Sequence, residues 1–145
     1  MVFLPSLLAP LTEASCFGGA EIAAFRLAQA LMGKGHRLTL IGCKGTVLPG
    51  AAVYEVNAAT PLLTMSPLDR SIADPFDSVF DWLEKQASQS LLDVLHLHLI
   101  DATALYRADA LARRFPRLAV VSTLHVCALY PETTKTVREL SQNHT

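Results

Sequence analysis

The stretch LDVLHLHLIDATALYRADALARRFPRLAVVST, residues 92–123, decides the fold. It opens with a nearly continuous apolar run, Leu92 to Leu97, which is typical of a strand covered on both faces of its sheet. Helical spacing of apolar residues predicts a helix from about Ala102 to Arg114, which ends before Pro116. The β-branched run from Leu118 to Thr123 predicts a second buried strand. Strand, helix and strand in this order predict a βαβ unit with parallel strands.

The rest of the chain repeats this alternation. Strands are predicted at 2–4, 37–41 and 53–56, and helices at 20–33, 74–88 and 131–140. Together these elements predict an α/β fold with a single Rossmann-like domain over residues 1–145. We expect an open, mostly parallel sheet with helices on both faces.

Composition excludes several classes of protein. With 145 residues, 51% hydrophobic and 17% charged, the chain can bury a sizeable core and does not resemble a disordered protein. A net charge of −1 removes the simplest argument for binding nucleic acid. The length leaves no room for two full-sized domains with a cleft between them. Three widely spaced cysteines and the lack of a long apolar span favour a soluble, cytoplasmic protein.

Polar and conformationally permissive residues gather where predicted strands end. Gly18-Gly19 lies between the first strand and the first helix, His96 and His98 end a later strand, and His125 follows the last. Ligands of open α/β sheets bind outside the carboxyl ends of the strands. If their strands are neighbours, these residues are therefore expected to face one crevice.

Each of these residues also has a structural interpretation. Glycines before a helix leave first-turn N–H groups open to an anion such as phosphate, but Gly18-Gly19 also suits a simple tight turn. His98 and His125 suit structural and functional roles alike, whereas a structural role is favoured for His96 within its strand. His96 and His98 share one strand face, and with His125 and Cys127 they offer a tetrahedral zinc set, although the spacing matches no familiar finger. We predict no resident metal ion and no cofactor.

Three segments of the chain form a combination found in one enzyme family. The first comprises GGAE at 18–21, LAQAL at 27–31 and GHRLTL at 35–40; the second is DVLHLH at 93–98 and the third VVSTLH at 120–125. They are similar to the patterns GGAE…LA.AL…GH.VTL, DVVHxH and PxVxTxHD. In order and spacing the chain thereby resembles the N-terminal domain of the family 4 glycosyltransferases, which are retaining enzymes of the GT-B fold.

The resemblance implies one half of a GT-B fold, which takes part in transferring a sugar from a nucleotide-sugar donor to an acceptor with retention at the anomeric carbon. It implies that Gly18 and Gly19 bind the donor pyrophosphate or an acceptor phosphate. It also implies that His98 lines the acceptor side and that His125 is the catalytic residue, in contact with the transferred sugar. Val126 stands where the family usually has an acid, so the hydrogen bond from that acid is missing.

The resemblance also implies a second domain. In this family the N-terminal domain mainly holds the acceptor and the C-terminal domain holds the nucleotide, and the 145 residues show no counterpart of the C-terminal acidic motif. We therefore expect a C-terminal half on another chain or missing from this sequence, and an isolated chain that is inactive. The acceptor itself is not identified; if it is a lipid, peripheral association with a membrane is expected.

Two alternatives stay open at this point. One is a non-catalytic α/β binding or interaction module that kept the fold without the chemistry. The other is a zinc-binding α/β protein that uses His96, His98, His125 and Cys127.

Overall fold

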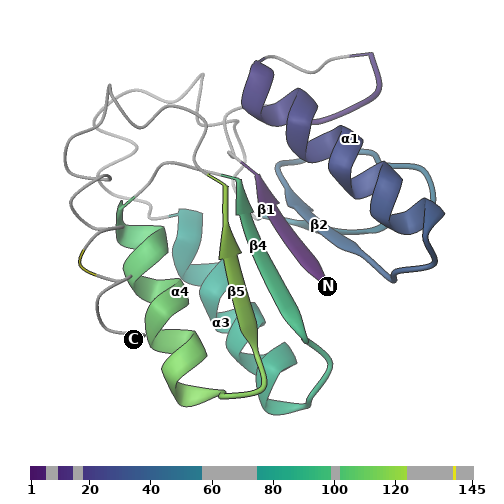
Figure 1. Ribbon diagram of the computed structural model, residues 1–145. Coiled ribbons are helices and arrows are strands. Elements are labelled where there is room, and N and C mark those ends of the chain that lie inside the picture. The colour runs from purple at the N-terminus through teal and green to yellow at the C-terminus, as the bar shows by residue number, and fades with distance from the viewer. Residues whose placement is uncertain (6–9, 15–17, 57–74, 99–101, 124–138, 140–145) are drawn as a thin grey trace, which may run out of the picture.

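The computed structural model describes residues 1–5, 10–14, 18–56, 75–98, 102–123 and 139 (Figure 1). Its strands are β1 (Val2–Pro5), β2 (Thr39–Gly42), β3 (Ala52–Glu55), β4 (Val94–His98) and β5 (Ala119–Ser122). Its helices are α1 (Gly19–Gly33), α3 (Pro75–Ser88) and α4 (Ala102–Arg114). The strands form one sheet in the order β3-β2-β1-β4-β5, and every neighbouring pair is parallel. The predicted α/β class, with an open parallel sheet, is confirmed.

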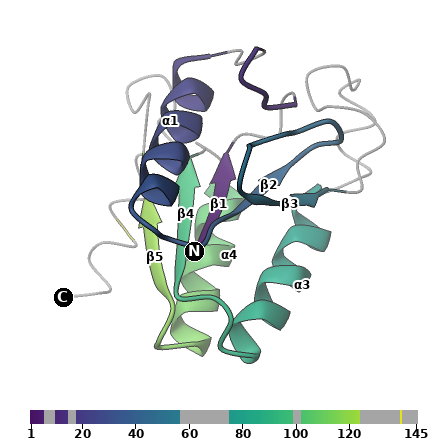
Figure 2. The ribbon, with the colours of Figure 1, turned by 90° about the vertical axis from the view of Figure 1, so that its right-hand side faces the viewer.

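Helices cover the two faces of this sheet, with α1 on one face and α3 and α4 on the other (Figures 1 and 2). Because side chains alternate along a strand, each strand contributes to both layers. On β1, Phe3 joins an apolar cluster with Phe25 and Ala28 of α1. Its neighbour Val2 joins the larger cluster on the other face, which includes Leu83 of α3. The prediction of helices on both faces is therefore confirmed.

Helix α1 ends where the glycines predict. The N–H of Lys34 donates to the carbonyl of Leu31 at 3.1 Å, and the N–H of Gly35 donates to that of Met32 at 2.9 Å. Gly35 has φ +87°, a left-handed conformation that glycine adopts without steric cost. The chain then turns back toward β2, which lies beside β1.

The loop after β2 supports the described residues that follow β1. The buried hydroxyl of Thr46 accepts a hydrogen bond from the N–H of Leu11 at 3.2 Å, and the N–H of Val47 donates to the carbonyl of Leu11 at 2.8 Å. Gly42 is required here, because a Cβ at this position would lie 2.5 Å from the Thr46 hydroxyl oxygen. Cys43, the next residue, is buried as a free thiol.

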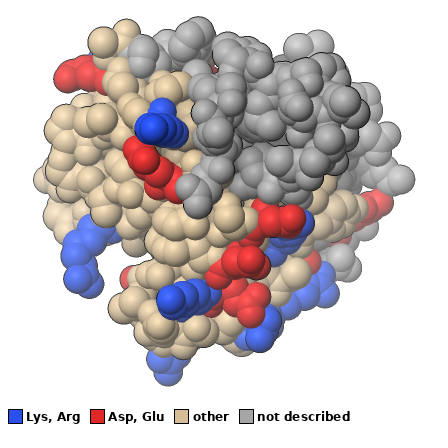
Figure 3. Space-filling model, turned by 180° about the vertical axis from the view of Figure 1, so that it is seen from behind, with Lys and Arg blue, Asp and Glu red and all other residues tan. Residues whose placement is uncertain are grey.

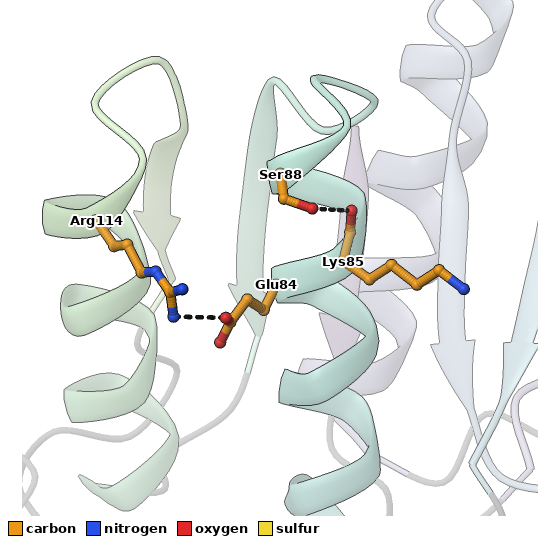
Figure 4. A network of polar contacts seen from close by, with 4 residues as sticks. All are labelled: Glu84, Lys85, Ser88 and Arg114. Carbon is orange, nitrogen blue, oxygen red and sulfur yellow. Dashed lines mark hydrogen bonds and ion pairs between the residues drawn. The ribbon is translucent and has the colours of Figure 1, made fainter.

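Charged side chains of both signs lie next to each other on the face that Figure 3 shows. Two ion pairs join α3 to α4: Arg107 binds Asp77, and Arg114 binds Glu84. Figure 4 shows the second pair and, separately on α3, the hydroxyl of Ser88, which donates to the carbonyl of Lys85 at 2.8 Å. Such exposed pairs are worth little individually, so the apolar layer beneath them holds these helices to the sheet.

One sequence prediction is wrong in part. Leu118 is buried, but Ala119, Val121 and Ser122 are exposed, so β5 is not the buried strand that its β-branched run predicts. Within the described residues β5 is an edge strand that pairs with β4 alone. The predicted helix at 131–140 lies outside the described residues except for Glu139, and so does Asp74, the predicted start of α3.

Candidate functional site

The strand order reverses between β1 and β4. From β1 the chain moves outward to β2 and β3 on one side, whereas β4 and β5 lie on the other. In open α/β sheets, ligands bind at such a switch point, outside the carboxyl ends of the strands. The register pairs Pro5 with His98, so β1 and β4 end level with each other at this edge.

The first turn of α1 lies at the same end of the sheet, because the helix follows the carboxyl end of β1 (Figures 1 and 2). Gly18 is the N-cap in an extended conformation, without a side-chain cap, and its carbonyl accepts the N–H of Ile22 at 3.0 Å. A Cβ added to Gly19 would meet no atom within 4 Å. Packing therefore does not require glycine at Gly19, where the space is open, whereas a Cβ added to Gly18 would lie 2.6 Å from a carboxylate oxygen of Glu21.

The histidines of β4 lie on the α1 face of the sheet, together with Phe3. The ring centroids of His96 and His98 are 4.2 Å apart, and those of Phe3 and His96 are 4.8 Å apart. His98 stacks on Phe3 with a centroid distance of 5.3 Å and an angle of 17° between the ring planes. The predicted same-face placement of the two histidines is observed. Both are buried, with 8% of His96 and 2% of His98 exposed.

His96 also contacts the end of β5. Its Nε2 lies 2.8 Å from Oγ1 of Thr123, and the N–H of Thr123 donates to the carbonyl of Leu97 at 2.9 Å. Thr123 and Phe3 were not among the residues predicted for the site. The signal that could have found Thr123 is its match to the threonine of the pattern PxVxTxHD. The partner of Phe3 depends on a register between strands about 90 residues apart.

The predicted convergence is thus observed for part of the set. Gly18, Gly19 and His98 lie at one edge of the sheet, beside the switch point. His125 and Cys127 lie outside the described residues, so their placement stays a prediction. Across the part of the chain that the structure describes, no three His, Cys, Asp or Glu side chains group as metal ligands. The four-ligand zinc site therefore stays a hypothesis.

Two cavities lie at the opposite, amino-terminal edge of the sheet. The larger, of about 640 Å³, is lined by residues that include Met1, Arg37, Thr39, Trp82 and Asp93. The smaller, of about 380 Å³, lies between the ends of α3 and α4 and β5. Neither is lined by Gly18, Gly19 or His98. The site at the carboxyl edge is therefore inferred from topology and chemistry rather than from cavity volume.

A comparison with known protein families shows to which family the chain belongs. A family model described as Glycosyltransferase Family 4 matches residues 17–142, which is most of the chain. The chain belongs to this family. It matches as the N-terminal domain, and its parallel sheet with helices on both faces is consistent with one half of a GT-B fold. No curated protein matches the chain.

The family match includes the candidate site residues at the carboxyl edge of the sheet. The matched region begins one residue before Gly18 and includes His98 and His125. A glycosyltransferase-like function is therefore supported in general terms. None of the described helices has both the length and the apolar character needed to cross a membrane.

Proposed function

We propose that this domain forms the acceptor-binding side of the active-site cleft of a retaining glycosyltransferase, which moves a sugar from a nucleotide-sugar donor to an acceptor. We call this side of the cleft the acceptor-side wall. One observation carries the proposal. In a family 4 domain, the first turn of α1, which is open beside Gly19, and the histidine that ends β4 lie at the same sheet edge, at the switch point. This is where an open α/β sheet binds its ligand.

Gly18 and Gly19 are proposed to bind phosphate. Free N–H groups in the first turn of a helix point at an approaching anion, and the helix dipole favours negative charge there. The open space beside Gly19 gives a phosphate group access to the backbone. Donors fixed in this way would stabilise the charge that develops on a departing pyrophosphate.

His98 is proposed to act from within the wall. With 2% of the residue exposed and its ring stacked on Phe3, it offers an acceptor little surface. This burial favours support of the acceptor side over direct contact with the acceptor. The contact with the transferred sugar is assigned to His125, as the family resemblance implies.

The second wall is proposed to come from a nucleotide-binding domain. A dry cleft between two domains strengthens electrostatic stabilisation of the transition state, because water is excluded from it. The described residues form one sheet with its covering helices. We therefore propose that catalysis requires this domain to meet a C-terminal half.

Titration with inorganic pyrophosphate tests the binding role of the glycines, with amide NMR signals as the readout. We compare Gly19→Asp with Gly19→Asn, which has nearly the same shape without the charge. The amide signals of Gly18 and Gly19 should shift in the wild type and in Gly19→Asn. In Gly19→Asp, charge repulsion should weaken binding about fivefold or more.

Equal affinity in the Asp and Asn variants would count against the phosphate site. Shifts confined to residues of the amino-terminal edge, such as Arg37 and Thr39, would do the same.

A further inference from the structure

The carboxyl end of strand β5 is exposed, so few apolar contacts hold it in place. Within the described residues it is an edge strand, and Val121 is 44% exposed. Thr123, directly after the strand, makes two contacts with β4: its N–H donates to the carbonyl of Leu97, and its hydroxyl meets Nε2 of His96. The backbone hydrogen bond extends the pairing of β4 and β5 one residue beyond the strand, and the side-chain contact adds a second link at the same residue.

The partner of Thr123 is itself held firmly. His96 is 8% exposed, pairs in register with Phe3 of β1, and contacts the rings of both Phe3 and His98. A buried ring packed between two others has few rotamers available. The Thr123 hydroxyl is thereby connected to the two strands that form the switch point.

We propose that Thr123 is a positioning residue: through His96, it fixes where the chain leaves β5 and so where the segment that carries His125 begins. His125 follows two residues later in the sequence. The catalytic meaning of this inference rests on the proposed function. A displacement of about 1 Å in a catalytic group is enough to cost a large factor in rate.

Substitution of either partner tests the pair. Thr123→Val keeps the shape and removes the hydroxyl, whereas Thr123→Ser keeps the hydroxyl. On the other side, the amide of His96→Gln reaches about as far as Nε2, whereas the amide of His96→Asn reaches only about as far as Nδ1. Ser122→Ala, next to Thr123, is the matched control, because Ser122 is exposed.

The readout is the NMR spectrum of the chain, recorded for the imidazole nitrogens of His96 and His125 and the backbone amide of His125. In Thr123→Val, the signals of both histidines should shift. In Thr123→Ser and Ser122→Ala they should stay at the wild-type positions. His96→Asn should shift the His125 signals more than His96→Gln does, which gives the same contrast if Thr123→Val does not fold.

The inference is overturned if Thr123→Val shifts the His96 signals and leaves those of His125 unchanged. Equal His125 shifts in His96→Asn and His96→Gln would overturn it as well. The spectra need no donor, acceptor or second domain. A response of His125 to Thr123→Val would therefore support the positioning role even if the assembled protein transferred no sugar.

Discussion

The two faces of β4 contact different kinds of side chain. Leu95 and Leu97 are fully buried in the apolar layer beneath α3 and α4. Between and after them, His96 and His98 lie on the opposite face, against Phe3 and the end of β5. The first face excludes water by apolar packing alone, whereas the second holds polar groups that need specific partners. One strand therefore combines a stabilising face with a face suited to function.

The largest expected effect comes from breaking the apolar face. Leu97→Ala removes a fully buried side chain and should lower the free energy of unfolding by about 2–5 kcal/mol. That is a large part of the total stability of a domain of this size. Urea denaturation measures it. Leu91→Ala is the control, because Leu91 is 64% exposed and its truncation should change stability little. Equal losses in the two variants would contradict the burial of Leu97.

A buried polar contact on the α1 side should give the next largest effect. Thr46→Val removes the hydroxyl that accepts the N–H of Leu11 and leaves that N–H without this acceptor. The expected loss is about 1–3 kcal/mol in the free energy of unfolding. Thr46→Ser keeps the acceptor and should lose less. If the serine variant is no more stable than the valine variant, the hydrogen bond is not the source of the effect.

The buried thiol of Cys43, which contacts Thr46, makes stability depend on pH. Burial, with a smaller contribution from the charge of Glu55, raises the pKa of Cys43 above its ordinary value, while hydrogen bonds to the backbone and Thr46 act in the opposite direction. Because the folded-state pKa of the thiol is the higher one, stability is greatest below the unfolded-state pKa, which is about 9. Stability falls as pH rises above that value and through the folded-state pKa, because the unfolded state then loses the thiol proton more readily than the folded state does.

Denaturation of the wild type and Cys43→Ala at pH 7 and pH 10 measures this effect. The wild type should lose more stability between the two pH values than the alanine variant does. Identical pH dependence in the two proteins would show that ionisation of Cys43 does not matter.

The smallest effect is expected for an exposed ion pair between α3 and α4. Arg114→Gln breaks the ion pair with Glu84, whose two side chains are 65% and 44% exposed. The expected change is at most about 0.5 kcal/mol, because water and salt screen such a pair. Thermal denaturation at low and high salt measures it. A loss as large as that of Leu97→Ala would show that the pair, rather than the apolar layer, holds α3 to α4.

Helices and strands were predictable where the local sequence patterns that indicate them agree. Apolar spacing and Pro116 predicted α4 at 102–114, and the structure has the same bounds. Alternation along a strand placed His96 and His98 on one face. The exposure of β5 was not predictable, because a β-branched run does not distinguish an edge strand from a central one.

Contacts between segments far apart in the sequence could not be predicted from the sequence patterns either. The pairing of Phe3 with His96 and the hydrogen bond between His96 and Thr123 depend on strand order and register, which no local pattern specifies. The candidate residues could be found one by one. Only the fold shows which of the described ones share an edge.

The most direct test of the proposed function is a transfer assay with several nucleotide sugars. It compares the chain alone with the chain mixed with the nucleotide-binding domain of a family 4 glycosyltransferase. We predict no measurable transfer by the chain alone and transfer with retention in the mixture, reduced when His125→Ala is used. Robust transfer by the isolated chain would contradict the proposal that this domain supplies only the acceptor-side wall.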